Sequence, residues 1–300
     1  MSDSRETSAP RQVIGTKRFR EPMAKPITTR IFTVANQKGG VGKTTSAVNV
    51  AAALAMGGLK TLIIDLDPQG NASTAFGISR DEVNGMYEVI IKDLPMQSAA
   101  LKIPGYPSLE VIPATQSLAN AEVELVPMVA REMRLKKSLN NYLLDAANKG
   151  ERFDYVIIDC PPSLGLLTIN ALVAAQELMI PIQCEYYSLE GLTLLLHTVS
   201  LIQEHLNPNI KLTTILLTMF DGRTRLANDV AAEVRKHYNA ELIDIPIPRA
   251  VRISEAPSYG QTVMTYDPAS IGAEAYGLVA REIARRGAPS SNSNSEKGVG

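Results

Sequence analysis

The chain has 300 residues, of which 45% are hydrophobic and 20% are charged, and its formal net charge is −1. The apolar share is ample for a buried core, and no apolar run approaches the roughly 20 residues needed to cross a bilayer. A net charge near zero does not by itself predict a polyanionic partner, so any nucleic-acid site must be a local patch. Cys160 and Cys184 lack metal-ligand spacing and are typical of buried residues in a cytosolic protein.

The first 29 residues differ in composition from the rest of the chain. They contain six basic and three acidic residues, which gives a net charge of +3, and they show almost no aliphatic periodicity. Such a segment cannot bury enough apolar surface to become ordered, so we expect residues 1–29 to form a flexible basic arm. The arm is either without a role or a tether for an acidic partner or nucleic acid. Residues 287–300, rich in Ser, Asn and Gly, predict a disordered tail.

Between these ends, short apolar runs of the buried-strand type alternate with helical patterns. The predicted strands are residues 30–36, 60–67, 109–114, 153–160, 177–183 and 211–219. Residues 188–207 place Leu192, Val199 and Ile202 on one stripe, as in an amphipathic helix. The alternation predicts right-handed crossovers and one α/β domain over residues 30–286. Its sheet is expected to be doubly wound and mostly parallel, with helices on both faces.

The stretch NQKGGVGKTT, residues 36–45, follows the first predicted strand and precedes a helical run of small residues. Its glycines let successive backbone amides converge on phosphate oxygens at the positive end of a helix. Lys43 is expected to contact the β- and γ-phosphates of a bound nucleotide, and Thr44 to give its hydroxyl to Mg²⁺. The expected phosphate-binding residues are Gly39, Gly40, Val41, Gly42, Lys43, Thr44 and Thr45.

This loop departs from the strict phosphate-loop pattern, because Gln37 stands where the first glycine is required. The form K-G-G-x-G-K-T-T, with a second lysine at Lys38, resembles the deviant Walker A P-loop ATPases. That superfamily includes ParA-type partition proteins, the Min-system ATPase and the nitrogenase iron protein. The resemblance implies that Lys38 reaches across a nucleotide-sandwich dimer to the phosphates bound by the partner. A lysine given in trans would neutralise part of the facing charge and couple dimerisation to nucleotide binding.

Acidic residues follow two further predicted strands, at the strand ends where open α/β sheets bind ligands. Asp65 and Asp67 end the second strand, and Asp159 ends the fourth. Because an unpaired aspartate after a buried strand is costly, Asp159 is expected to hold Mg²⁺ directly or through water. The resemblance implies that Asp67 positions the attacking water, and Asp65 is expected to support Thr44 or the magnesium shell.

Within the superfamily, the likeness is to chromosomal ParA-type sequences and extends over nearly all of residues 30–284. Segments that carry it include DLDPQGNAS, IIDCPPSLGLLTINAL, PIQCEYYSLEGL and IPRAVRISEAPSYGQTV. The nitrogenase-like and iron–sulfur carrier branches need a cysteine pattern that Cys160 and Cys184 do not supply. The Min-type branch ends in a basic amphipathic helix that lies on membrane, whereas polar residues follow Arg286 here. We therefore expect no membrane partner.

The ParA-type resemblance implies a cytoplasmic, nucleoid-associated ATPase that uses ATP and Mg²⁺ and forms a homodimer in the ATP state. It also implies non-specific binding to double-stranded DNA and a slow hydrolysis that a centromere-binding ParB-type protein stimulates. In relatives, arginines that match Arg223 and Arg252 contact DNA, and contacts to phosphate are independent of sequence and sensitive to salt. The alternative is that both are solvated surface arginines. Arg225 and Arg249 are further candidates by proximity.

The resemblance places the adenine near the segment IPIPRAVR, with Pro248 close to the base. Ala250 stands where relatives often have asparagine, and its side chain has no donor or acceptor. Backbone groups must therefore recognise the base at this point. Met219 is expected either to pack on the base or to belong to the core.

Together these expectations describe an ATP-dependent DNA-segregation switch in chromosome partitioning. The alternative is a nucleotide-gated regulator of replication initiation or polar assembly that acts through protein contacts. In that case the arm at residues 1–29 would bind a polar scaffold. Truncation of the arm separates the two readings, because loss of partner binding with intact DNA binding favours the regulator.

Overall fold

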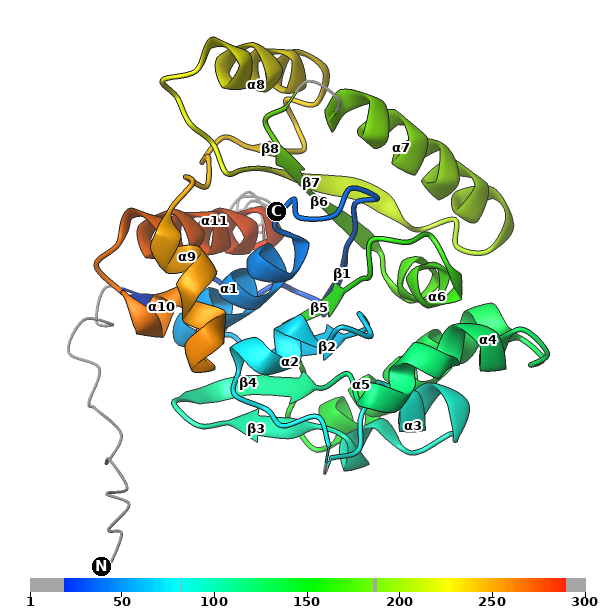
Figure 1. Ribbon diagram of the computed structural model, residues 1–300. Helices are drawn as coiled ribbons and strands as arrows, with labels where there is room; N and C mark the ends of the chain where they lie inside the picture. Colours follow the sequence, from blue (N-terminus) through cyan, green and yellow to red (C-terminus); the bar gives the residue numbers. More distant parts are fainter. Residues whose placement is uncertain (1–18, 82, 186–187, 290–300) are drawn as a thin grey trace, which may run out of the picture.

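The computed structural model describes residues 19–81, 83–185 and 188–289. Within these ranges, eight strands form one sheet in the order β3-β4-β2-β5-β1-β6-β7-β8 (Figure 1). All neighbouring strands are parallel except β3 and β4, which are antiparallel. The strands are β1 (Arg30–Val34), β2 (Thr61–Asp65), β3 (Leu101–Ile103), β4 (Tyr106–Ile112), β5 (Tyr155–Asp159), β6 (Glu177–Gln183), β7 (Lys211–Thr218) and β8 (Leu242–Ile243).

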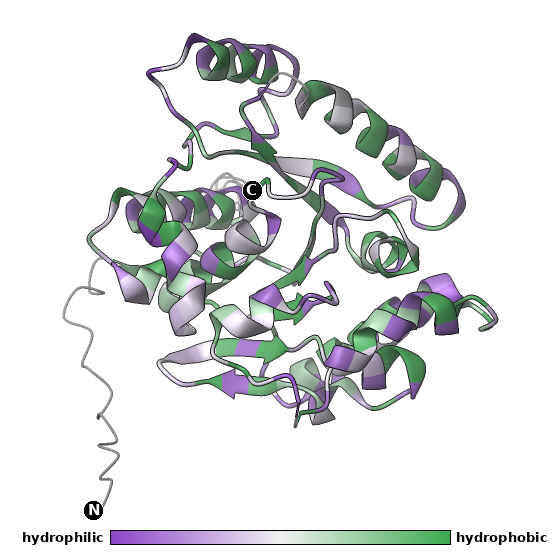
Figure 2. Ribbon diagram, viewed as in Figure 1, coloured by the Kyte–Doolittle hydropathy of each residue, from purple (hydrophilic) through white to green (hydrophobic). Residues whose placement is uncertain are grey.

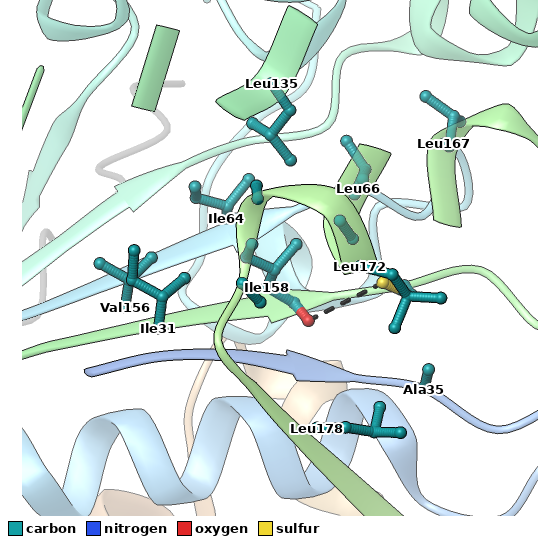
Figure 3. Packing of buried hydrophobic residues seen from close by; sticks show 14 of the residues in the cluster. Ile31, Ala35, Ile64, Leu66, Leu135, Val156, Ile158, Leu167, Leu172 and Leu178 are labelled. Atoms are coloured by element: carbon teal, nitrogen blue, oxygen red, sulfur yellow. Dashed lines mark hydrogen bonds between the residues drawn. The ribbon is translucent and has the colours of Figure 1, made fainter. Parts of the chain in front are cut away.

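The central strands are buried on both faces, which explains why their sequences are continuous apolar runs. Successive side chains of a strand point to opposite faces, so Ile31 of β1 and Phe32 beside it enter different core clusters. Figure 3 shows Ile31 and Val156 side by side in one of these clusters, with Ile158 between them and Leu172. In Figure 2 the central strands are mainly hydrophobic, whereas the helices mix hydrophilic and hydrophobic residues.

Helices cover both faces of the sheet, and the expected doubly wound, mostly parallel α/β fold is confirmed. One face carries α1 (Lys43–Met56), α2 (Asn71–Ala75), α9 (Val251–Glu255), α10 (Val263–Tyr266) and α11 (Ile271–Gly287). The other carries α3 (Met86–Ile91), α4 (Ala121–Leu125), α5 (Arg134–Asn148), α6 (Leu166–Ala174), α7 (Ser188–His205) and α8 (Arg225–His237). Short 3₁₀ turns are η2 (Met96–Ser98), η3 (Gln116–Asn120), η4 (Arg131–Met133) and η5 (Ala256–Tyr259). Among the helices of the described ranges, none is long and apolar enough to cross a membrane.

The segment before β1 packs on the domain, which corrects the boundary expected at residue 30. Phe19 is only 4% exposed and lies against α11, where a Cβ on Gly277 would come within 2.6 Å of its ring. The Met23 amide donates to the Gly57 carbonyl at 3.0 Å, and the Thr29 hydroxyl donates to the Phe153 carbonyl at 2.6 Å. Residues 19–29 therefore belong to the folded body. Residues 1–18 of the predicted arm and 290–300 of the predicted tail lie outside the described residues.

Phe19→Ala is expected to lower the free energy of unfolding by about 3 kcal/mol, because it removes a buried aromatic ring and leaves a cavity under α11. Urea denaturation measures this change. Ile27→Ala is the matched control, since Ile27 lies in the same segment but is 71% exposed, and its effect should stay within about 0.5 kcal/mol. Equal effects of the two substitutions would contradict the packing of this segment.

Candidate nucleotide-binding site

The carboxyl ends of β1, β2 and β5 lie side by side at one edge of the sheet. In the parallel register, Val34 of β1 and Asp65 of β2 both pair with Asp159 of β5. The glycine loop that follows β1 is therefore adjacent to the two acidic strand ends, and α1 begins directly after it (Figure 1). Open α/β sheets bind their ligands at this edge.

The backbone of the glycine loop has the conformation of a phosphate cradle. Gly40 and Gly42 have φ angles of +73° and +82°, in the left-handed region that favours glycine. A Cβ on Gly40 would meet no atom within 4 Å, so this side of the loop is open. The Val41 carbonyl accepts a 2.8 Å hydrogen bond from the Thr218 hydroxyl, which ties the loop to the end of β7. The loop is thus held in place by β7 at Val41 and is open at Gly40.

Lys43 is the first residue of α1 and is only 7% exposed. Its ammonium donates to the Lys38 carbonyl at 3.2 Å and forms no ion pair within 4.0 Å in the described part of the chain. Burial lowers the pKa of Lys43, while the negative charges of Asp159 and Asp67 oppose that shift. A buried lysine without a bonded carboxylate, at the positive end of a helix, favours an anionic ligand.

Asp159 is completely buried, and neither of its carboxylate oxygens has a hydrogen-bond partner among the described residues. Burial and the nearby charge of Asp65 raise its pKa well above the usual value, although the neighbouring Thr44 hydroxyl and Lys43 act in the opposite direction. An unpartnered buried carboxylate is costly unless a cation compensates it. The position therefore fits a Mg²⁺ ion, which prefers oxygen ligands.

The remaining ligands for such an ion would come mainly from phosphate and water. No group of three or more His, Cys, Asp or Glu side chains with metal-site geometry occurs in the ranges that the structure describes. Mg²⁺ is typically bound by one or two protein oxygens together with substrate phosphates and water. Asp159 and the adjacent Thr44 provide a donor set of this kind.

Asp65, which is expected to support Thr44 or the magnesium shell, accepts hydrogen bonds on both of its carboxylate oxygens. Its Oδ2 accepts hydrogen bonds from the Ser73 amide at 2.8 Å and the Ser73 hydroxyl at 2.7 Å, and its Oδ1 accepts from the Asp67 amide at 3.3 Å. Burial raises the pKa of Asp65 to about 6, against the effect of the Ser73 hydrogen bonds. Because protein donors occupy both oxygens, Asp65 shapes the loop after β2.

Asp67 lines a pocket of about 540 Å³ together with Lys43, Thr44 and the glycines of the loop. Its Oδ1 accepts from the Gln69 amide at 3.0 Å, and no described residue donates a hydrogen bond to Oδ2. One carboxylate oxygen of this pocket-lining residue therefore has no hydrogen-bond donor among the described residues. Further lining residues that the sequence did not single out are Asn49, Asn71, Pro162, Ser254, Pro257 and Gln261.

A second pocket, of about 310 Å³, adjoins the first and shares Gly42 and Thr45 with it. Met219, Pro248 and Ala250, the residues expected near the base, line it together. Met219 has a φ of +49°. The next residue, Phe220, forms a parallel β-bridge with Pro248. Because Met219 faces both pockets, it is not a residue of the core alone.

Lys38 does not extend away from the chain. Its ammonium forms a hydrogen-bonded ion pair with the Glu185 carboxylate, on the loop between β6 and α7. The two side chains are 39% and 46% exposed. Glu185 lies in the segment PIQCEYYSLEGL, which carries part of the ParA-type likeness, but sequence analysis assigned no role to this residue. The lysine expected to act in trans is thus held in cis in the single chain.

Arg223 and Arg252 lie on the surface, outside the two pockets. Arg223, with 89% of its side chain exposed, pairs with Asp221 at 2.7 Å. Arg252 pairs with Glu255 at 3.1 Å and Asp267 at 3.5 Å, and its guanidinium lies 5.9 Å from the ring centre of Tyr266. Both arginines are accessible to a large ligand, and each already pairs with a partly buried carboxylate.

Sequence comparison assigns this architecture to a family. A family model described as an AAA domain matches residues 29–212. The chromosome partitioning protein ParA of Myxococcus xanthus is 48% identical over 263 residues, which cover 87% of this chain and 90% of that protein. The sporulation initiation inhibitor protein Soj of Bacillus subtilis is 49% identical over 259 residues, or 86% of this chain and 99% of that protein. The chain belongs to the ParA-type family of P-loop ATPases.

Proteins of known structure that share the fold of this ParA-type chain are named for other activities than chromosome partitioning. A Mycobacterium smegmatis protein named cobyrinic acid a,c-diamide synthase, solved with bound ADP and magnesium, is 36% identical with a TM-score of 0.73. The match covers 86% of this chain and 95% of that chain. The cell division ATPase MinD of Pyrococcus furiosus, 23% identical with a TM-score of 0.68, shares the fold. Since one fold carries several activities, the function must be argued from the site.

Proposed function

We propose that this ParA-type chain binds ATP and Mg²⁺ in the two adjoining pockets and acts as an ATP-dependent DNA-segregation switch. The observation that carries the proposal is the buried, unpartnered carboxylate of Asp159 beside the buried ammonium of Lys43, next to an open glycine loop. This combination suits a metal-bound polyphosphate and would be costly without one. The relative in Myxococcus xanthus that is named as a chromosome partitioning protein supports the assignment to DNA segregation.

In the proposed ATP complex, the amides of Gly39 to Thr45 surround the phosphates, and Lys43 contacts the β- and γ-phosphates. Asp159 and Thr44 would hold Mg²⁺, and the bound ion would supply positive charge against the charge that develops on the phosphates. The free oxygen of Asp67 orients a water in line with the γ-phosphate. Orientation of this kind suffices because phosphoryl transfer depends mainly on alignment and electrostatic stabilisation.

The proposed switch couples this chemistry to dimerisation. Lys38 exchanges its contact with Glu185 for the phosphates of the partner's nucleotide, so that only the ATP state forms the sandwich homodimer. The dimer doubles the number of exposed arginines that can reach one DNA duplex. A centromere-binding ParB-type protein then stimulates the slow hydrolysis, which separates the dimer and releases the DNA.

Arg223 and Arg252 are proposed to bind DNA phosphates in place of their carboxylate partners within the chain. Each such contact releases counterions, so affinity should fall steeply with salt and be independent of sequence. A dimer would make four of these contacts. The Arg223→Ala/Arg252→Ala variant is therefore expected to lower the slope of log K against log[salt] by about 3 to 4.

Fluorescence anisotropy of a random-sequence duplex tests this expectation, with ATP, with ADP and without nucleotide, across a salt series. Arg285→Ala is the matched control, because Arg285 is also exposed and paired, but lies at the end of α11 near the start of β1. The proposal requires binding with ATP alone, a reduced salt slope in the double variant and an unchanged slope in the control. Equal binding in every nucleotide state would contradict it.

The alternative of a regulator of replication initiation or polar assembly depended on the arm at residues 1–29. Residues 19–29 pack on the domain, and a contact of residues 1–18 with a polar scaffold concerns residues outside the described ranges. The described residues offer no observation that favours this alternative over the segregation switch.

A further inference from the structure

The side chain of Arg80 joins the loop after β2, which lines the nucleotide pocket, to the loop after β4. Its Nε donates to the Ala114 carbonyl at 3.0 Å, and its Nη1 donates to the Gln69 carbonyl at 2.6 Å. Its Nη2 donates to the carbonyls of Pro68 and Thr115. In the described part of the chain, Arg80 forms no ion pair with a carboxylate within 4.0 Å. A half-buried guanidinium is thus committed entirely to backbone carbonyls.

The turn that Arg80 holds is the one that follows Asp67. The Asp67 carbonyl accepts from the Gly70 amide at 2.8 Å, while its carboxylate accepts from the Gln69 amide. The position of the Asp67 carboxylate therefore depends on the conformation of residues 68–70. Gly70 has a φ of +66°, and a Cβ there would come within 2.2 Å of Arg80 Nε, so the guanidinium lies directly on this turn.

The other side of the same turn is fixed by a separate set of hydrogen bonds. Ser73 donates to Asp65, and its hydroxyl oxygen accepts from the Ala114 amide at 3.1 Å. The loop after β2 is thus fastened to residues 114–115 after β4 at two places, by Ser73 and by Arg80. Loss of Arg80 would leave the Ser73 attachment in place and free residues 68–70.

We infer that Arg80 is a positioning residue for ATP hydrolysis, which holds the turn at residues 68–70 so that Asp67 keeps its orientation toward the γ-phosphate. This inference depends on the role proposed above for Asp67. Arg80 is not among the residues that line either pocket, so it acts on the reaction through the turn. A guanidinium is required because its planar fork reaches carbonyls of both loops, whereas a lysine offers a single point charge.

Arg80→Lys is expected to lower kcat for ATP hydrolysis about 10- to 100-fold, since small displacements of an orienting group have large effects on rate. The affinity for a fluorescent ATP analogue should stay within about threefold of that of the unmodified chain, because Lys43 and the glycine loop are untouched. In Arg80→Ala, a few millimolar guanidinium should restore part of kcat. These readouts separate a positioning role from a contribution to stability alone.

Arg152→Lys is the matched control. Arg152 also donates to two backbone carbonyls, those of Pro26 and Ile27, but lies before β5 at the opposite edge of the sheet. The Arg152→Lys substitution should lower Tm and should change kcat for ATP hydrolysis by no more than about twofold. A kcat for Arg80→Lys within twofold of the unmodified chain would overturn the inference. A loss of nucleotide affinity in parallel with kcat would also overturn it.

Combination with Asp67→Ala tests the route by which Arg80 acts, using single-turnover hydrolysis. If Arg80 works through Asp67, Arg80→Lys should add no further loss of rate in the Asp67→Ala background. An equal loss in both backgrounds would overturn the inference and leave the proposed function intact. If Asp67→Ala alone hydrolyses ATP at the normal rate, the proposed mechanism fails, and the inference fails with it.

Discussion

Asp67→Ala is expected to lower the rate of ATP hydrolysis by about 10²-fold or more, which is the usual contribution of a group that orients or deprotonates the attacking water. ATP affinity should be unchanged or somewhat higher. The Asp67 carboxylate contributes negative charge at Asp159 and Lys43, and its removal reduces repulsion toward the phosphates. Hydrolysis under single-turnover conditions and binding of a fluorescent ATP analogue measure the two effects separately.

Asp81→Ala is the control for this substitution. Asp81 lies in the next loop and is engaged by the Gln116 side chain, away from the lining of the pocket. Its removal should leave hydrolysis within about twofold. In the proposed switch, Asp67→Ala should also prolong ATP-dependent DNA binding, because the dimer is no longer dissolved by hydrolysis. An unaltered hydrolysis rate in Asp67→Ala would exclude the proposed role.

The strands of the sheet were predictable because burial on both faces leaves long apolar runs in the sequence. All six predicted strands occur, as β1, β2, β4, β5, β6 and β7. The sequence missed β3 and β8, which have three and two residues and form only because a longer neighbour offers its edge. The sequence did not predict that the folded domain begins near residue 19. Phe19 is buried there, but a single aromatic residue gives no periodic pattern from which its burial could be predicted.

The site was predictable where its residues are consecutive. The glycine loop is a single stretch whose conformation follows from its glycines, and it lines the pocket of about 540 Å³. Asp65 and Asp67 are two residues apart at the end of the same strand, and the sequence already assigned them different roles, support of Thr44 or the magnesium shell and positioning of the attacking water. The hydrogen bonds from Ser73 to Asp65, eight residues earlier, carry no sequence motif and were not predicted. Glu185 and Arg80 come from loops whose approach depends on the tertiary fold.

Lys38→Ala is expected to bind ATP but to lose ATP-dependent dimerisation. Two nucleotides that face each other repel strongly, and each lysine given in trans replaces part of that repulsion by a charge-assisted hydrogen bond. Such bonds contribute about 1.5–3 kcal/mol each, and a dimer contains two, so the dimer dissociation constant should rise about 10²-fold or more. Analytical ultracentrifugation with a non-hydrolysable ATP analogue measures this change, and unchanged dimerisation would contradict the role of Lys38.

Glu185→Gln should have the opposite effect, because it releases Lys38 from its partner within the chain. The pair is roughly half exposed, so its loss changes the free energy by at most about 1 kcal/mol in each subunit. Dimerisation should accordingly become up to about 30-fold tighter, given two subunits. In the Lys38→Ala background the same substitution should have no effect, since Glu185 acts only by holding Lys38. An equal gain in both backgrounds would mean that Glu185 influences the dimer by another contact, and that Lys38 is free to reach its partner without first leaving Glu185.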